Sequence, residues 1–176
     1  MVFGMLLTVY KGYQLWEGYI KTVATSYLEF VSRQKLTYDE LAINFVAVAM
    51  KFKLKEASET NKATIFTEVA NFMLTQASQK TSLPFEDVIS TGSNLSSDIL
   101  REIVCILGLD YSFYKTKEVI INEQLLKRRN GIAHGEYLLL DREEYQQLHD
   151  EILEMMEHFR TQIENNAIQK SYLRNP

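Results

Sequence analysis

The chain has 176 residues, enough for one well-buried domain and short for two, so we expect a single domain over residues 1–176. The net charge of −4 argues against nonspecific binding of phosphates over the whole surface, which needs a broad basic field, although a local basic site remains compatible with it. With only 2 prolines and 7 glycines, the chain lacks the regular turns of an all-β protein. The sequence therefore predicts an all-α fold.

Two features bear on the location of the protein. The single cysteine, Cys105, excludes a disulfide or a multi-cysteine metal site within one chain. The apolar run from Met1 to Tyr10 has no basic leading segment and is far shorter than the roughly 20 residues that span a bilayer, so we expect a core helix and not an anchor. Both features favour a cytoplasmic protein.

Three helices are expected in the first half of the chain. A stripe of apolar residues at alternating steps of three and four predicts a long helix between Leu6 and Val31. A capping box of Thr37 and Glu40 predicts a second helix that runs to about Lys53. The spacing of four further apolar residues predicts a third helix. The first stripe is Leu6, Val9, Tyr13, Trp16, Ile20, Val23, Tyr27 and Phe30, and the third helix carries Ile65, Val69, Phe72 and Met73.

The second half of the chain begins with a turn-rich run over 91–98 that precedes a short buried helix, closed by Gly108 as its C-cap. The segment 110–122 shows no period and is expected to be a loop with short extended structure. Asn122 is expected to cap the next helix, which the pair Asn130-Gly131 should weaken or bend. Asp141 should cap a long final helix. The predicted fold is an antiparallel bundle of five or six helices.

The stretch RRNGIAHGEY, Arg128 to Tyr137, is the candidate functional site. One interpretation is structural: basic residues complement the dipole of a helix end, two glycines allow a turn, and His134 fills a corner. The other is chemical, because a permanently charged guanidinium, an amide and a group that titrates near neutral pH lie within a few residues. If the backbone is helical from Asn130, the step of four to His134 places these two side chains about 40° apart on one face.

These residues resemble the motif of a known superfamily. Arg129-Asn-Gly-Ile-Ala-His134, followed by Gly135, is similar to the Arg-x4–6-His motif of the HEPN superfamily (higher eukaryotes and prokaryotes nucleotide-binding domains). The helix that precedes the motif, the long helix after it and the helix start at Ser93 to Glu102 also resemble stand-alone prokaryotic members. The resemblance implies an all-α, HEPN-like helical domain.

The resemblance also implies a metal-independent endoribonuclease that uses no cofactor. Arg129 and His134 would be catalytic, Asn130 would help to hold the phosphate, and Arg128 would bind phosphate or take the role of Arg129. The chemistry agrees, since RNA carries its own nucleophile, the 2′-OH. A catalyst then has to move protons, which His134 can do, and to stabilise charge on the phosphorus, which Arg129 can do.

One histidine does not easily act as both base and acid on opposite sides of a phosphate, and His149 and His158 lie far along the acidic final helix. The resemblance implies a homodimer whose two motifs face one cleft, with RNA as substrate, a toxin or defence role and a cognate antitoxin or inhibitor protein as partner. Tyr137 does not match the modifiable tyrosine of some family toxins and is expected to be structural. The rival hypotheses are a noncatalytic HEPN module that binds nucleotides, RNA or protein, and a purely structural helical interaction protein.

Overall fold

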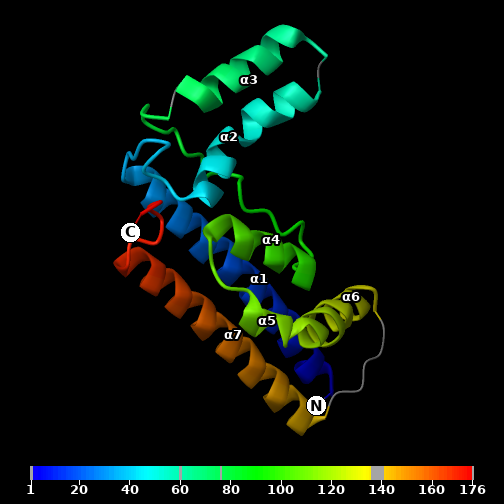
Figure 1. The fold of residues 1–176 in the computed structure, drawn as a ribbon. Helices are drawn as coiled ribbons and strands as arrows, with labels where there is room; N and C mark the ends of the chain where they lie inside the picture. The colour runs from blue at the N-terminus through cyan, green and yellow to red at the C-terminus, as the bar shows by residue number, and fades with distance from the viewer. Residues whose placement is uncertain (1, 60, 76, 136–140, 176) are drawn as a thin grey trace.

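The computed structural model describes residues 2–59, 61–75, 77–135 and 141–175 (Figure 1). Within these ranges the chain forms helices and two isolated bridges, Thr37 to Lys80 and Leu41 to Leu173, and no strand. The all-α class predicted from the sequence is confirmed. The described helices are α1 (Val2–Arg33), α2 (Ile43–Ser58), α3 (Ala63–Thr75), α4 (Ser97–Leu107), α5 (Ser112–Lys115), the π-helix η1 (Ile120–Lys127), α6 (Arg128–Ala133) and α7 (Arg142–Ile168).

The long helix α1 forms the centre of the core and packs against α4, η1, α6 and α7. Tyr13, Trp16 and Ile20 are each 0% exposed, so the predicted stripe is the buried face of this helix. The stripe ends at Phe30, which is 39% exposed. The side chains of Leu6 and Val9 lie outside the part that the structure describes.

Helices α1 and α7 lie side by side and run in the same direction (Figure 1). Gly12 faces Ile152 near the start of both helices, and Phe30 contacts Tyr172 just beyond the end of α7, with ring centroids 5.7 Å apart. The antiparallel arrangement predicted for the bundle is therefore wrong for this pair. The segment from α5 to α6 does run antiparallel to α7. Lys117 pairs with Glu151, and Arg128, further along this segment, pairs with Glu144, which lies nearer the start of α7.

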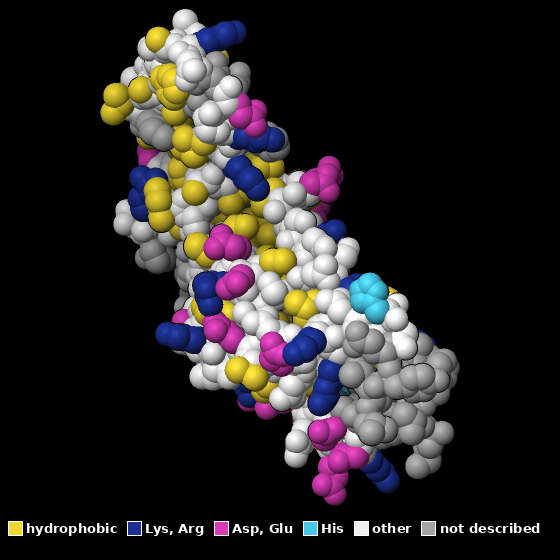
Figure 2. Space-filling model, turned by 90° about the vertical axis from the view of Figure 1, so that its right-hand side faces the viewer, with side chains coloured by type: hydrophobic (Ala, Val, Ile, Leu, Met, Phe, Trp, Pro, Cys, Tyr) yellow, Lys and Arg dark blue, Asp and Glu magenta, His cyan; other side chains and the backbone are white. Residues whose placement is uncertain are grey.

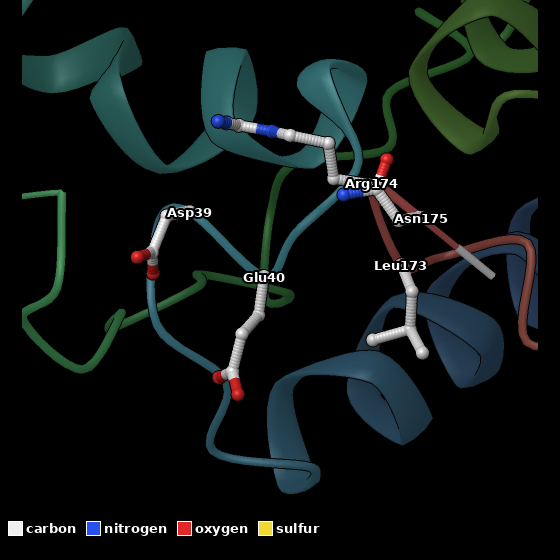
Figure 3. A pocket seen from close by; sticks show the side chains of 5 residues that line it. All are labelled: Asp39, Glu40, Leu173, Arg174 and Asn175. Atoms are coloured by element: carbon white, nitrogen blue, oxygen red, sulfur yellow. The ribbon is translucent and has the colours of Figure 1, made fainter.

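The second helix begins later than predicted. Thr37 and Glu40 form the expected contact, in which the Thr37 N–H donates to Glu40 Oε2 over 2.8 Å, but α2 starts at Ile43 and continues to Ser58. The C-terminal segment holds the intervening residues: the Ala42 N–H donates to the Tyr172 carbonyl, and Arg174 Nη2 donates to the Tyr38 carbonyl. Figure 3 shows Arg174, on the C-terminal segment, above Asp39 and Glu40 of the loop before α2.

Helices α2 and α3 form a hairpin that projects from the rest of the molecule (Figure 1). The ring of Phe72 on α3 meets that of Tyr38 edge-on at 4.8 Å, which ties the hairpin to the bundle. Other apolar side chains of α3 face outward, since Phe66 is 49% and Leu74 is 83% exposed. Figure 2 shows apolar side chains gathered on this part of the surface. Within the described ranges, no helix is long and apolar enough to cross a membrane.

The region before the motif differs most from the prediction. Ser96 caps α4, within the turn-rich run predicted to precede this helix, and Gly108 ends α4 with a φ of 68°, as expected. The segment 110–122 is helical instead of a loop with extended structure: it contains α5 and leads directly into η1. Asn122 does not cap a helix, because it lies inside η1 and its side chain contacts Ser97 on α4.

Candidate functional site

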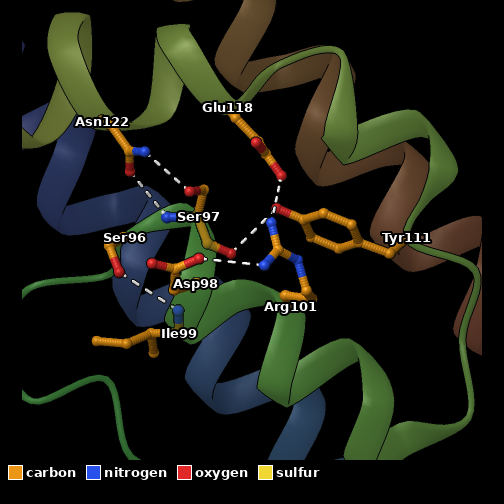
Figure 4. A network of polar contacts seen from close by, with 8 residues as sticks. All are labelled: Ser96, Ser97, Asp98, Ile99, Arg101, Tyr111, Glu118 and Asn122. Atoms are coloured by element: carbon orange, nitrogen blue, oxygen red, sulfur yellow. Dashed lines mark hydrogen bonds and ion pairs between the residues drawn. The ribbon is translucent and has the colours of Figure 1, made fainter.

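A side-chain clamp joins the start of α4 to η1. The Ser97 N–H donates to Asn122 Oδ1 over 2.9 Å, and Asn122 Nδ2 donates to Ser97 Oγ over 2.8 Å (Figure 4). Because Ser97 is buried, its N–H and its Oγ have no access to water, and the side-chain amide of Asn122 supplies their hydrogen-bond partners. One helical turn further along α4, Arg101 pairs with Asp98 of the same helix and with Glu118 of the segment before η1. The segment that leads into the motif is therefore fixed relative to α4.

The motif itself lies on α6, which continues η1 without a break. Eight residues of π-helix, Ile120 to Lys127, come first, and π-helical turns are often found at functional sites. The pair Asn130-Gly131, which was predicted to weaken or bend the helix, does not end it: α6 runs through both residues and stops after Ala133, with Gly131 buried. The helix ends at His134, and Gly135 follows with a φ of 77°, a left-handed conformation that glycine adopts without strain.

Arg129 turns toward the bundle and is held by two amide oxygens. Its Nη1 donates to Asn130 Oδ1 over 2.7 Å and to Asn94 Oδ1 over 3.2 Å. The centre of its guanidinium lies 5.4 Å from the ring centroid of Tyr13 and 6.0 Å from that of Tyr10. Among the described residues, Nη2 has no partner and Nε is buried without one. The guanidinium thus has a fixed orientation and unused donors.

The ring of Tyr13 packs against the guanidinium of Arg129. Burial of its hydroxyl, and next the nearby carboxylate of Glu17, raise the pKa of Tyr13 to about 12, against the smaller opposing effects of the Leu95 backbone and Arg129. Tyr13 is therefore neutral at physiological pH. It contributes an aromatic face to Arg129 and no negative charge.

Arg128, the neighbouring arginine, is held by a different element. Its Nη2 lies 3.9 Å from Glu144 Oε1 in the first turn of α7, and its side chain is 26% exposed. Arg128 and Arg129 therefore do not act as one basic pair. Their different environments favour Arg129 for the arginine role and leave Arg128 beside it as a second, partly neutralised charge.

His134 is exposed at the C-terminal end of α6. Its N–H donates to the Asn130 carbonyl over 3.0 Å, so one helical turn separates the two residues and places their side chains about 40° apart. The step of five from Arg129 corresponds to about 140°, so Arg129 and His134 point to different sides of α6. One chain does not bring the predicted catalytic pair onto a single helix face.

The other residues considered from the sequence have structural contacts or lie elsewhere. Tyr137 lies outside the described residues. The Asp141 side chain accepts a 2.8 Å hydrogen bond from the Glu144 N–H and caps α7, as predicted. His149 stacks near Tyr145 at 6.1 Å, and His158 stacks on Phe113 at 4.0 Å. These two histidines have aromatic neighbours and do not join the motif.

Sequence reasoning did not single out Asn94, Tyr13 or Glu144 as neighbours of the two arginines. Asn94 precedes Arg129 by 35 residues, and a lone asparagine in a turn has no periodic pattern to mark it. Tyr13 was recognised as a core residue, which it is, but one face of its ring also meets Arg129. Glu144 lies in the first turn of α7, on a different element from Arg128.

The structure thus combines an all-α fold with an Arg-Asn-x3-His sequence that lies on the short helix α6, before the long final helix α7. The RiboL-PSP-HEPN family model matches residues 13–165, and the chain belongs to this HEPN family. The match includes α4, the motif and most of α7. No curated protein and no solved structure matches the chain.

Proposed function

We propose that this HEPN protein is an endoribonuclease that cleaves RNA by attack of a 2′-OH on the adjacent phosphate and needs no metal ion. The observation that carries the proposal is the arrangement of Arg129, whose Nη1 donates to the side-chain oxygens of Asn94 and Asn130 while Nη2 has no partner among the described residues. A preorganised donor of this kind stabilises charge that develops on a phosphate in the transition state. Asn130 has a place in the same site because it holds Arg129.

His134 supplies the proton transfer in this scheme. Its exposed imidazole accepts the proton of the 2′-OH, the 2′-oxygen forms a bond to phosphorus, and the bond from phosphorus to the 5′-oxygen breaks. The leaving 5′-oxygen takes a proton from a second acid. The products are a 2′,3′-cyclic phosphate and a 5′-hydroxyl, so atoms and charge balance without a further reagent.

The second acid is His134 of a second copy of the chain. Arg129 and His134 point to different sides of α6, so a cleft that contains both groups requires the motif of another subunit beside the first. We therefore propose a homodimer with a composite site. As its resemblance to stand-alone prokaryotic HEPN proteins suggests, the dimer would act in the cytoplasm as a toxin or defence effector, restrained by an antitoxin or inhibitor protein.

The distribution of surface charge agrees with RNA binding at one small site. On the face drawn in Figure 2, basic and acidic side chains of the described residues are interspersed, so RNA has no continuous basic track there. We propose that affinity for RNA comes from a small number of contacts, such as those of Arg129 and Arg128. A site of this kind suits a short single-stranded segment better than a long duplex.

A noncatalytic HEPN module that binds RNA or nucleotides is the second candidate. The divergent directions of Arg129 and His134 favour it, because binding requires no shared face. The experiment is cleavage of a mixed-sequence RNA by the purified protein in excess chelator. The wild type should cleave, Arg129→Ala and His134→Ala should not, and His149→Ala, which removes another exposed histidine, should cleave normally. RNA binding without cleavage by the wild type would support the noncatalytic module.

A further inference from the structure

The structure assigns to Asn94 the role of positioning Arg129 for the proposed reaction. Asn94 lies in the turn before α4, far from the motif in sequence, and its Oδ1 accepts a hydrogen bond from Arg129 Nη1 over 3.2 Å. The inference rests on the proposed function, because positioning has catalytic meaning only if Arg129 is catalytic. Asn94 touches the arginine and not the RNA, so it is a positioning residue.

The turn that carries Asn94 is itself held firmly. Gly92 and Ser93 have φ values of 58° and 60°, and the Asn94 N–H donates to the Thr91 carbonyl over 3.0 Å, which closes the turn. Thr91 and Leu95 are 7% and 0% exposed and anchor it on both sides. The amide of Asn94 therefore starts from a fixed backbone, although its side chain is at the surface.

The contact between Arg129 and Asn94 is the second of two polar contacts between residues 94–97 and the helical segment 122–129. Asn122 holds Ser97, and Arg129 holds Asn94. Both contacts join the segment that leads into α4 to the segment formed by η1 and α6, and together they align α6 along the loop before α4.

The contact determines which donors of Arg129 are left for a phosphate. Nη1 has two hydrogens, and the oxygens of Asn130 and Asn94 take both. The ring of Tyr13 limits movement of the guanidinium on one side. Loss of the Asn94 oxygen leaves the charge in place and lets the guanidinium plane rotate. A phosphate then meets the same charge in many orientations, which lowers the rate more than the binding.

The test measures the arginine and the reaction separately. NMR of the labelled guanidinium gives the rate of rotation about the Nε–Cζ bond of Arg129. We expect Asn94→Ala to increase this rate roughly ten-fold or more, because a hydrogen bond to a charged group is lost, and Asn94→Asp to keep it slow, because an acceptor oxygen remains. Ser93→Gly, which preserves the left-handed backbone of the same turn, should change nothing. Equal rotation in the wild type and Asn94→Ala overturns the inference.

The kinetic arm uses RNA cleavage in the presence of chelator. Asn94→Ala should lower kcat roughly ten-fold with KM changed by less than about two-fold. An unchanged kcat, or a loss confined to KM, contradicts the inference. In an Arg129→Lys background, which keeps residual activity but lacks the planar group that Asn94 holds, Asn94→Ala should have no further effect. A wild type that cleaves no RNA overturns the proposed function and with it the catalytic role of Asn94, whereas the rotation rates still decide whether Asn94 fixes the arginine.

Discussion

Arg128 and Glu144 face each other between α6 and α7, with Nη2 and Oε1 3.9 Å apart. The carboxylate of Glu144 competes with any phosphate that approaches Arg128, although the pair is long and partly exposed. The first residues of the final helix thus limit how much of the basic character of the motif is available to RNA.

Glu144→Gln should therefore tighten the binding of single-stranded RNA by roughly two- to five-fold at low salt, and steepen the slope of log Kd against log salt by about 0.7, the value for one more phosphate contact. The free energy of unfolding should change by less than about 1 kcal/mol, because the pair is solvent-screened. Glu143→Gln is the matched control: it removes the same charge from the same helical turn without this partner. An equal gain for both variants would mean that only net charge matters.

Replacement by lysine should affect RNA cleavage differently at Arg129 and Arg128. Arg129→Lys keeps a positive charge but loses the planar group that contacts Asn94 and Asn130, so we expect kcat for RNA cleavage to fall by roughly 10²–10³-fold. Arg128→Lys should reduce it by less than about ten-fold. Steady-state kinetics on one RNA measures both. A larger loss for Arg128→Lys would assign the arginine role to Arg128 instead.

The elements that could be predicted are those with a periodic or local signal. The buried face of α1 follows from its apolar spacing, and the caps at Gly108 and Asp141 follow from residue type and place. The motif on α6 could be identified from its residue types, but the residues that contact it from other segments could not be predicted. The contact of Arg129 with Asn94 joins segments that are distant in sequence, and no local pattern encodes it.

Three further errors have physical causes. The capping box of Thr37 and Glu40 forms, but the C-terminal segment holds Ala42, so tertiary contacts set the start of α2. Asn122 has the residue type of a cap, yet its amide satisfies the buried Ser97 instead. The parallel packing of α1 and α7 depends on the path of the chain between them, which apolar spacing within each helix does not specify.

The cap of α7 gives a prediction about stability. Asp141→Ala removes the acceptor of the Glu144 N–H and should lower the free energy of unfolding by about 1 kcal/mol, within roughly 0.5–2 kcal/mol. Asp141→Asn keeps an acceptor oxygen and should stay close to the wild type. Denaturant unfolding measures both variants. If the Ala and Asn variants are equally stable, the cap does not stabilise α7.

Alkaline pH should destabilise the fold through Tyr13. Burial raises its pKa in the folded state to about 12, above the ordinary value of 10.0, so the stabilising contribution is complete below pH 10 and is lost as the pH rises toward 12. Tyr13→Phe should flatten the fall of stability with pH in this window, and RNA cleavage should persist because the ring stays beside Arg129. Unfolding curves between pH 9 and about 12 test this, and an unchanged profile would contradict the assignment.

The most direct measurement of the central claim is the chemistry of the RNA ends that the purified protein leaves in excess chelator. Attack by the 2′-OH, assisted by His134 and stabilised by Arg129, predicts fragments that end in a 2′,3′-cyclic phosphate and begin with a 5′-hydroxyl, which mass spectrometry distinguishes from other ends. Fragments that begin with a 5′-phosphate, or cleavage that occurs only after a divalent metal ion is added, would contradict the account.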